Sequence, residues 1–456
     1  MYQFTEEIIS KYSVIGPRYT SYPTAPIWHE IDRKTQNNWL ESNAGSERAI
    51  SLYIHIPFCR ERCLYCGCNV VVTRQQKASS EYVPYLLREI ESIAKVRQRN
   101  RVIKQIHFGG GTPNFLLNSE IEQIMNHIKD RFELNTDTEI GIEIDPCSTH
   151  PQLLDFLSGI GFNRLSLGVQ DINETVQRAV NRIQSKETTY EHLVAARQAG
   201  FKGINFDLIY GLPFQTLQSF RETVDEVIRM RPDRLAVYNF GYLPDRMIHQ
   251  RKIKPETLPN PATKLEILLD TINRFSEAGY NYIGMDHFSL PDDELSVAQK
   301  NRTLYRNFMG YTPKSGMDLY GIGMTAISEF DRYFIQNEKK LKGYKDAVDS
   351  ESLSGSRGLK LSDDDQRRKW TIMKLICHFY LDFDEFQKTF EQRFTDYFAD
   401  EFSNLKELEE DGLIEIHSDS IVVKNIGQIL VRNICMIFDA YLMKQDTPPV
   451  KYSKTI

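Results

Sequence analysis

The stretch Ile50-Ser-Leu-Tyr-Ile-His-Ile56, followed by Pro-Phe-Cys59-Arg-Glu-Arg-Cys63-Leu-Tyr-Cys66-Gly-Cys68, decides how this chain is expected to fold. Its first part is a run of β-branched, aromatic and apolar residues, which is typical of a buried strand. The second part places four of the chain's seven cysteines within ten residues. We therefore expect a strand that leads directly into a cysteine-rich loop.

Beyond this stretch, short apolar runs alternate with longer amphipathic segments. The runs predict strands, and the segments with apolar residues at helical spacing predict helices. This alternation indicates parallel βαβ units, and six or seven consecutive units predict an α/β fold with a full or partial barrel. The expected strands are Ile50–Ile56, Gln105–Phe108, Glu139–Asp145, Asn163–Val169, Gly203–Ile209, Arg234–Phe240 and Tyr280–Met285, and the expected helices include Glu81–Val96, Ser119–Phe132, Leu217–Met230 and Ala262–Ala278.

Several of the expected strands end in polar or glycine-rich sequence. These ends are Gly109-Gly-Gly-Thr-Pro113, Glu143-Ile-Asp145, Gln170-Asp171 and Asp207. Barrels and open α/β sheets carry their functional groups at the carboxyl ends of their strands. We therefore expect the functional site at that end of the barrel.

The remainder of the chain differs from the barrel in composition and in its predicted elements. Residues 340–365 are rich in Lys, Asp, Ser and Gly and predict a linker. The sequence predicts an N-terminal segment over 1–48, the barrel over 49–340 and a mostly helical domain over 360–456. This last domain is expected to resemble a winged helix, with helices over Gln366–Tyr380, Phe383–Asp411 and Ile426–Met443 and a hairpin within Leu413–Val423.

Composition excludes several classes of protein. The chain has 56 Lys and Arg against 62 Asp and Glu, a net charge of −6, which disfavours a protein that coats nucleic acid. It begins without a basic region followed by an apolar one, and it lacks an apolar run long enough to span a membrane. We expect a cytoplasmic protein with no membrane span, in which seven cysteines make structural disulfides improbable.

The cysteine loop has the spacing C-x3-C-x2-C followed by C-x-C. Structural zinc sites use two cysteine pairs separated by a dozen or more residues, and this loop lacks the second pair. Three thiolates in one compact loop favour an iron–sulfur cube whose fourth iron is open to a ligand. Zinc, a redox disulfide and incidental clustering are the alternatives.

With Tyr65 as the aromatic residue, the loop resembles the C-x3-C-x-aromatic-C signature of radical S-adenosylmethionine (SAM) enzymes, and Gly109–Pro113 resembles their glycine motif. From about residue 11 onward the chain resembles the oxygen-independent coproporphyrinogen III oxidase family. The matching segments are Gly16-Pro-Arg-Tyr-Thr-Ser-Tyr-Pro-Thr24, Ser51–Phe58, Asn163–Asp171, Asp207-Leu-Ile-Tyr-Gly-Leu-Pro213, Ile283–Phe288, Pro291–Leu295 and Arg432–Cys435.

This resemblance implies a partial (β/α)6-type radical SAM barrel. It also implies a [4Fe-4S] cluster on Cys59, Cys63 and Cys66, with Cys68 as a cysteine that is not a ligand. It also implies two bound molecules of SAM, and it leaves catalytic residues unassigned. We expect the carboxylate of Asp207 to be balanced by a bound SAM and by Arg182. The residues implied for the first SAM are Tyr53, Gly110 and Glu143, and those implied for the second, or for the space between the two, are Tyr65, Gly111, Thr112, Gln170, Arg182, Asp207, Gly241 and Ile327.

The implied reaction is the oxidative decarboxylation of two propionates of coproporphyrinogen III to vinyl groups by a 5′-deoxyadenosyl radical. The implied partners are this tetrapyrrole and a low-potential electron donor such as a flavodoxin-type protein, with no nucleic acid and a monomeric enzyme. Arg18, Tyr19 and Tyr22 are candidates for substrate contact, with a packing turn as the alternative. The chain departs from the family at Gly241-Tyr242, Cys147 and Tyr305, which leaves the substrate pose open.

Other functions stay open at this point. A haem-binding chaperone of the same superfamily is one, although such relatives typically lack the Gly16–Pro23 segment and a cysteine at position 68. Another radical reaction on a tetrapyrrole is a second. A non-catalytic iron–sulfur regulator is a third, but it requires a basic recognition helix, and the C-terminal hairpin and last helix are not basic enough.

Overall fold

The predicted strand Ile50–Ile56 is strand β2, and every one of its residues is buried or half-buried. The computed structural model describes residue 8 and residues 11–351 and 353–442. Within these residues the chain forms two compact units. The barrel unit contains His29–Pro259 and Gly316–Lys360, and the composite unit contains the N-terminal residues up to Trp28, Asn260–Ser315 and the residues from Leu361 onward.

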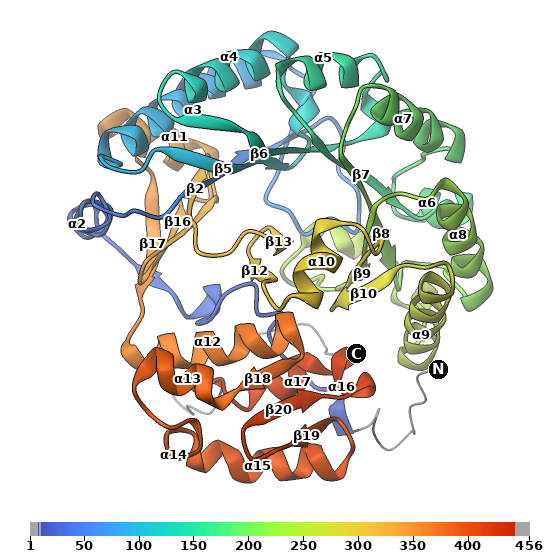
Figure 1. Ribbon diagram of the computed structural model, residues 1–456. Helices are drawn as coiled ribbons and strands as arrows, with labels where there is room; N and C mark the ends of the chain where they lie inside the picture. Colours follow the sequence, from blue (N-terminus) through green and yellow to red (C-terminus); the bar gives the residue numbers. More distant parts are fainter. Residues whose placement is uncertain (1–7, 9–10, 352, 443–456) are drawn as a thin grey trace. The chain divides into compact units, whose positions relative to one another are not determined.

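The barrel unit is built on a curved sheet in which seven neighbouring strands are parallel, in the order β14-β2-β5-β6-β7-β8-β9. The antiparallel strands β15, β16, β17 and β1 extend the sheet beyond β14. The helices of this unit follow the outside of the sheet (Figure 1). The bounds are β1 His29–Glu30, α2 Arg33–Ser42, β2 Ile50–Ile56, β3 Phe58–Cys59, β4 Val71–Val72, α3 Lys77–Val96, β5 Val102–Gly110, α4 Asn118–Lys129, β6 Glu133–Ile144, α5 Leu153–Ile160, β7 Arg164–Gln170, α6 Glu174–Ala179, α7 Lys186–Gln198, β8 Gly203–Tyr210, α8 Leu217–Met230, β9 Arg234–Asn239, β14 Asp318–Ile322, β15 Ile327–Phe330, β16 Tyr333–Asn337, α11 Leu341–Glu351 and β17 Gly355–Lys360, with short 3-10 helices at Pro113–Phe115, Pro146–Ser148, Ile248–Lys252 (η4) and Pro255–Thr257.

Side chains alternate along the parallel strands, as the period of two in a strand requires. In β7, Leu165, Leu167 and Val169 are buried, while Ser166 and the other intervening residues are only half-buried. Ser166 belongs to the half-buried set, which faces the inside of the barrel. The parallel register places Glu143 and Asn205 beside it on the neighbouring strands, since each of them pairs with Ser166. The fold therefore brings polar side chains from successive strands together inside the barrel.

The predicted linker over residues 340–365 is wrong. The segment forms helix α11 and strand β17, and β17 pairs with β16. Tyr344 and Val348 of α11 are buried, and the Tyr344 hydroxyl donates a 2.7 Å hydrogen bond to the Glu89 carboxylate of α3. Two buried residues one turn apart are enough to pack a short helix that is mostly polar.

The composite unit contains the predicted C-terminal helices and hairpin, with more breaks than expected. Its three-stranded sheet has the order β18-β20-β19, and β19 and β20 form the predicted hairpin. The expected helix Phe383–Asp411 is three helices, and the expected helix Ile426–Met443 is two, with its last residue outside the described residues. The bounds are a 3-10 helix at Ala25–Ile27, α9 Pro261–Glu277, β10 Asn281–Gly284, β11 His287–Ser289, α10 Glu294–Lys300, β12 Tyr305–Asn307, β13 Gly310–Thr312, α12 Asp363–His378, β18 Tyr380–Asp382, α13 Phe383–Phe390, α14 Phe394–Tyr397, α15 Ala399–Glu410, β19 Ile414–Ile416, β20 Ser420–Val423, α16 Asn425–Ile429 and α17 Val431–Met436.

The seventh predicted strand, Tyr280–Met285, is not a further parallel βαβ unit. It forms β10, which pairs antiparallel with β11 within the composite unit. The partial barrel is therefore confirmed with six predicted parallel strands rather than seven. No helix in the described part of the chain is long and apolar enough to cross a membrane.

Candidate active site

The cysteine loop leaves the barrel at the end of β2 and is closed at its base by two short strands. Phe58–Cys59 pairs in parallel with Val71–Val72, and the Thr73 amide donates a 2.9 Å hydrogen bond to the Cys59 carbonyl. The Leu64 amide donates to the Val180 carbonyl at 2.9 Å. These contacts fix both ends and the middle of the loop.

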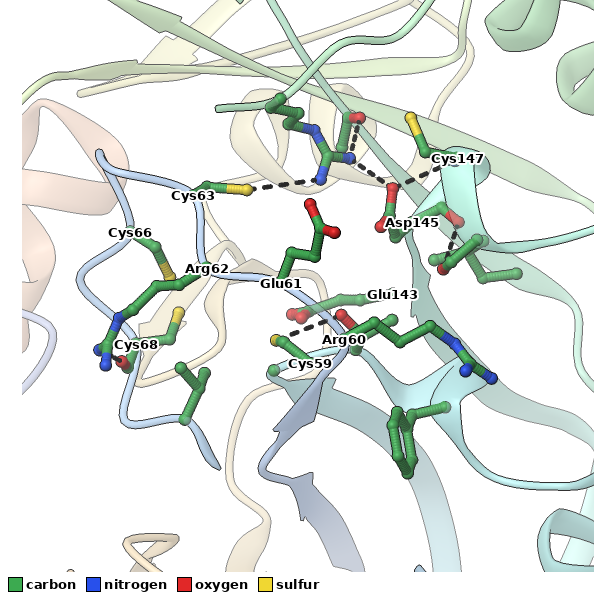
Figure 2. A pocket seen from close by; sticks show the side chains of 18 of the residues that line it. Cys59, Arg60, Glu61, Arg62, Cys63, Cys66, Cys68, Glu143, Asp145 and Cys147 are labelled. Atoms are coloured by element: carbon green, nitrogen blue, oxygen red, sulfur yellow. Dashed lines mark hydrogen bonds and ion pairs between the residues drawn. The ribbon is translucent and has the colours of Figure 1, made fainter. Parts of the chain in front are cut away.

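Cys59, Cys63 and Cys66 line one cavity of about 780 Å³ together with residues from the ends of the barrel strands (Figure 2). The Thr112 hydroxyl donates to the Cys59 sulfur at 3.3 Å, and Arg182 Nη1 lies 3.9 Å from the Cys63 sulfur. Burial raises the pKa of the Cys59 thiol to about 11, whereas a hydrogen bond from Cys68 lowers the pKa of Cys66. Cys68 and Cys147 line the same cavity. The three thiols of the C-x3-C-x2-C loop, two of them facing donors, fit the three-cysteine ligand set of a [4Fe-4S] cluster.

The glycine turn packs tightly against the start of the cysteine loop. The Gly111 amide donates to the Ile56 carbonyl at 2.8 Å, and the Thr112 amide donates to the Phe58 carbonyl at 2.9 Å. A Cβ atom on Gly110, whose φ is +115°, would lie 2.6 Å from the His55 ring. The turn therefore needs glycine for close packing as well as for any approach of a ligand.

Glu143 lies beneath this turn and is held from two sides. Its carboxylate accepts a 3.2 Å hydrogen bond from the Gly110 amide and lies 3.2 Å from His107 Nε2. The Tyr53 ring stacks on the His107 ring, with centroids 6.1 Å apart. Burial opposes charge on both groups, but their pairing raises the pKa of His107 and lowers the pKa of Glu143, so the pair favours imidazolium and carboxylate.

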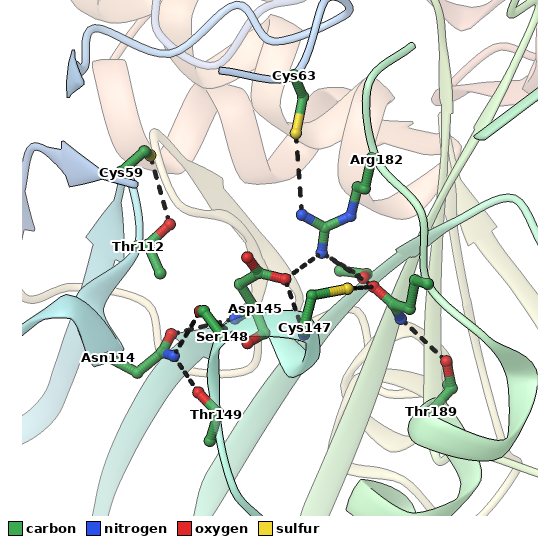
Figure 3. Close-up of polar contacts among 12 residues, drawn as sticks. Cys59, Cys63, Thr112, Asn114, Asp145, Cys147, Ser148, Thr149, Arg182 and Thr189 are labelled. Carbon is green, nitrogen blue, oxygen red and sulfur yellow. Dashed lines mark hydrogen bonds and ion pairs between the residues drawn. The ribbon is translucent and has the colours of Figure 1, made fainter. Parts of the chain in front are cut away.

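The expected pairing of Asp207 with Arg182 is wrong. Asp207 accepts hydrogen bonds from Ser166 Oγ and Asn205 Nδ2, both at 2.9 Å, and burial together with the charge of Glu143 raises its pKa to about 6. Arg182 instead forms a 2.9 Å ion pair with Asp145 (Figure 3). The sequence predicts both carboxylates, those of Asp145 and Asp207, at strand ends. Only the folded structure shows which of the two pairs with Arg182.

Arg182 is fixed by several contacts at once. Its Nη2 also donates to the Gly168 carbonyl at 2.8 Å and to Gln184 Oε1 at 3.2 Å. Its Nε is buried and has no partner among the described residues. A buried cation with a spare donor beside the thiol of Cys63 is suited to binding an anionic group such as a carboxylate.

The cavity gathers most, but not all, of the predicted cofactor residues. Tyr53, Gly241 and Ile327 lie outside its lining. The Gly241 carbonyl accepts a 3.1 Å hydrogen bond from Gln250, which also reaches the Tyr65 carbonyl at 3.5 Å, and Ile327 begins β15. The predicted residues that line the cavity are Cys59, Cys63, Tyr65, Cys66, Gly110, Gly111, Thr112, Glu143, Gln170, Arg182 and Asp207.

Sequence reasoning missed two residues that organise the site, Asp145 and His107. Asp145 belongs to the polar strand end Glu143-Ile-Asp145, so its position was visible although its partner was not. His107 alternates with Gln105 and Gly109 along β5, and this period of two was the available signal. Cys147 also lines the cavity, and its thiol lies 3.3 Å from the Ile183 carbonyl.

The N-terminal candidates for substrate contact belong to the composite unit. Tyr19 and Tyr22 are buried, and their hydroxyls are engaged by Asp439 and by the Ala440 amide at 3.1 Å. These contacts favour packing for the two tyrosines. Arg18 is partly exposed and forms an ion pair with Asp286.

The barrel with its cysteine loop defines the class of protein. Residues 53–227 match the Radical SAM superfamily, and residues 361–430 match the HemN C-terminal domain. The chain is a radical SAM enzyme, and its cofactors are a [4Fe-4S] cluster and SAM.

Full-length relatives define the family within this class. The oxygen-independent coproporphyrinogen III oxidase of Pseudomonas aeruginosa is 45% identical over 439 residues, which cover 96% of this chain and 95% of the relative. The Escherichia coli protein of the same name is 45% identical over 450 residues, covering 98% of both chains. A solved structure described as coproporphyrinogen III oxidase (HemN) from Escherichia coli superposes with a TM-score of 0.90 at 45% identity, over 93% of this chain and 97% of that one. The chain therefore belongs to the family of oxygen-independent coproporphyrinogen III oxidases, which confirms the predicted family and fold class.

Proposed function

We propose that this enzyme converts coproporphyrinogen III to protoporphyrinogen IX without oxygen. The 5′-deoxyadenosyl radical that bound SAM would supply takes a hydrogen atom from the β-carbon of a propionate. Loss of carbon dioxide, with transfer of one electron to a one-electron acceptor, then leaves a vinyl group, and the same sequence on a second propionate completes the reaction. The observation that carries the proposal is the single cavity lined by Cys59, Cys63, Cys66, Glu143 and Arg182, in a chain 45% identical over nearly its full length to oxidases of this name.

The cavity residues fall into two groups, those that would hold the cluster and those that would bind SAM. When bound, the cluster and SAM supply an electron and a 5′-deoxyadenosyl radical. Cys59, Cys63 and Cys66 would hold the cluster, and the donors of Thr112 and Arg182 offset negative charge on two of the thiolates. The Gly110 amide holds the Glu143 carboxylate in the cavity wall. There the carboxylate can accept a hydrogen bond from the ammonium group of the methionyl part of SAM.

The second SAM molecule is part of the proposal. Tyr53, Gly110 and Glu143 serve the first molecule, and Tyr65, Gly111, Thr112, Gln170, Arg182, Asp207, Gly241 and Ile327 serve the second or the space between them. Support comes from Asp207 and Arg182, which line the same cavity but have separate partners. Each can therefore face a different group of a ligand.

The remaining predictions concern partners and surroundings. We propose a flavodoxin-type protein as the electron donor, a monomeric enzyme and a cytoplasmic location. We also propose that the N-terminal residues 1–48 cover the substrate, with Arg18 as a carboxylate contact. The partly exposed guanidinium of Arg18 supports this role, since coproporphyrinogen carries four carboxylates.

Anaerobic turnover tests the proposed function. The reconstituted enzyme, coproporphyrinogen III, SAM and dithionite should yield a tetrapyrrole that has lost two molecules of carbon dioxide by mass. The variant Cys63→Ala should yield none. If the wild-type enzyme binds haem tightly and leaves coproporphyrinogen III unchanged, the chaperone alternative replaces the proposal.

A further inference from the structure

The cysteine loop contacts a short basic segment, the 3-10 helix η4 (Ile248–Lys252). His249 Nε2 lies 2.8 Å from the Cys66 carbonyl. The Gln250 side chain donates to the carbonyls of Tyr65 and Gly241 at 3.5 Å and 3.1 Å. The His249 side chain therefore connects η4 directly to the backbone of Cys66, a proposed ligand of the cluster.

Cations without a carboxylate partner are concentrated at this contact. Arg251 and Lys252 are exposed, and Arg62 Nη2 donates to the Cys68 carbonyl at 3.5 Å. None of these three forms an ion pair with a described carboxylate. Arg62 belongs to the same loop as Cys66, whose carbonyl His249 contacts. Ile248, the first residue of η4, is 71% exposed.

More positive charge lies on another part of the same loop. Asn69 Nδ2 donates to the Lys339 carbonyl at 2.8 Å. Burial lowers the pKa of Lys339, and the charges of Arg357 and Arg246 lower it further, so three cations lie close together there. Nearby Glu338 accepts hydrogen bonds from the Lys339 and Lys340 amides. We call Arg62, Arg246, Arg251, Lys252, Lys339 and Arg357 the basic collar.

We propose that the basic collar is the docking surface for a small acidic protein that carries one electron. The inference rests on the proposed function, because the reaction begins with one electron from outside the enzyme. In the step, the carrier is oxidised by one electron and the cluster is reduced by one, and no proton or bond is transferred. A carrier seated on the collar contacts the loop that holds Cys66.

The charges of the molecule as a whole favour this assignment. The chain has a net charge of −6, so its overall charge does not attract an acidic carrier, and attraction depends on a local concentration of cations. Exposed Ile248 beside Arg251 and Lys252 provides an apolar contact within a charged rim, which is the usual anatomy of a transient interface. Complementary charge of this kind acts mainly on the association rate and on specificity.

The test is a double charge reversal, Arg251→Glu with Lys252→Glu, on the reconstituted enzyme. The matched control is Lys34→Glu with Lys202→Glu, two exposed lysines of the barrel unit that do not line the cavity and give the same change in net charge. The probes are a recombinant bacterial flavodoxin and a bacterial ferredoxin, each labelled for anaerobic fluorescence anisotropy. We expect the collar variant to bind the carrier that the wild type prefers about tenfold more weakly, with a shallower dependence on salt, and the control to stay within about twofold.

Turnover with two reductants separates docking from other roles. The collar variant should form 5′-deoxyadenosine at the wild-type rate with dithionite and more slowly with the protein carrier. Equal carrier binding by the collar and control variants overturns the proposal, as does failure of both carriers to bind the wild type. An equal loss with dithionite also overturns it, because the collar then serves the substrate or the loop itself. Absence of tetrapyrrole product from wild type with dithionite contradicts the proposed function instead.

Discussion

The carboxyl of Asp207 lies inside the barrel, where burial and the nearby charge of Glu143 raise its pKa from 3.8 to about 6. Between these two pKa values the folded state keeps a proton that the unfolded chain has already released. The free energy of unfolding therefore falls as pH rises from about 4 to about 6, and the loss is constant at higher pH. Asp207→Asn should stabilise the cluster-free protein by about 1 to 3 kcal/mol at pH 7.5, with the gain vanishing near pH 4.

Thermal unfolding across this pH range checks the prediction, with exposed Asp130→Asn as the control that shows no such trend. The same Asp207→Asn variant should retain its cluster spectrum but form little product, because its carboxylate is proposed to face the second SAM. A variant that is both stable and fully active would remove Asp207 from the site.

We expect Cys59, Cys63 and Cys66 to be ligands of the cluster and their neighbour Cys68 not to be one. Cys59→Ala, Cys63→Ala and Cys66→Ala should each abolish cluster assembly, since a three-thiolate site cannot spare one. Cys68→Ala should retain its iron, because the resemblance gives Cys68 no ligand role although it hydrogen-bonds to Cys66. Iron and sulfide analysis after anaerobic reconstitution decides the matter, and a near-complete cluster in any of the first three variants would contradict the assignment.

Asp145 is expected to position Arg182. Asp145→Asn removes the 2.9 Å ion pair and leaves the guanidinium held by Gly168 and Gln184. The loss of one charge-assisted contact should weaken SAM binding about tenfold. Equilibrium dialysis measures this, and Glu61→Gln, which neutralises a carboxylate of the cavity lining that pairs with Arg74, serves as the control. Equal affinities in the two variants would show that Arg182 is held without Asp145.

These residues mark the limit of what the sequence predicts about the site. The cysteine spacing and the polar strand ends predicted the components of the cavity, because parallel strands bring their carboxyl ends together. The choice of Asp145 over Asp207 as the partner of Arg182 depends on the exact reach of one side chain, and no spacing rule encodes it. Without the fold, the two carboxylates are equivalent.

At the scale of elements, Glu89 connects parts of the barrel unit that are distant in sequence. Its buried carboxylate accepts hydrogen bonds from the Gly323 amide, Asn337, Tyr344 and Ser354 at 2.7 to 3.1 Å. It therefore joins α3 to the ends of β14 and β16, to α11 and to the start of β17. Burial raises the pKa of Glu89 to about 7 despite these donors.

Glu89→Ala leaves four buried donors without their acceptor and should cost about 3 to 5 kcal/mol of unfolding free energy. Glu89→Gln keeps one acceptor oxygen and most of the volume, so it should cost clearly less. Urea unfolding followed by circular dichroism measures both variants. A cost below about 1 kcal/mol for Glu89→Ala would show that other contacts hold these elements.

The same elements show why the sequence failed at residues 340–365. The parallel strands were predicted from their apolar residues, and Ile50–Ile56 matches β2 at both ends. Strand β6 begins at Glu133 rather than at the predicted Glu139, because its first half is polar and mostly exposed. Helix α11 carries few apolar residues and is stabilised by Tyr344 packing near α3, a contact 255 residues apart in sequence. The composition of residues 340–365 therefore resembled that of a linker.

The described part of the molecule consists of two units that do not follow sequence order. The barrel unit carries every predicted cofactor residue, whereas Arg18 and its partner Asp286 belong to the composite unit, which gathers three separate parts of the chain. A contiguous division into residues 1–48, 49–340 and 360–456 could not anticipate this, because the return of Asn260–Ser315 to the composite unit depends on tertiary packing. The domain boundaries predicted from the sequence stay predictions.

This division predicts that cofactor cleavage and substrate oxidation can be uncoupled. Arg18→Ala should keep forming 5′-deoxyadenosine, because the cofactor residues are intact, while the vinyl product falls about tenfold or more with the loss of a charged substrate contact. Arg18→Lys should lie between, since it keeps the charge but not the fork of the guanidinium. Liquid chromatography of both products from one anaerobic reaction gives their ratio.

Arg432→Met provides the matched control for a purely structural effect. Arg432 is buried and donates to the Gly16 and Pro17 carbonyls, so it holds the backbone next to Arg18 without presenting its own charge to solvent. Its loss should lower the melting temperature and reduce both products in proportion. If Arg18→Ala behaves in the same way, with a lower melting temperature and an unchanged product ratio, then Arg18 stabilises the N-terminal segment. A raised ratio at an unchanged melting temperature assigns it to the substrate.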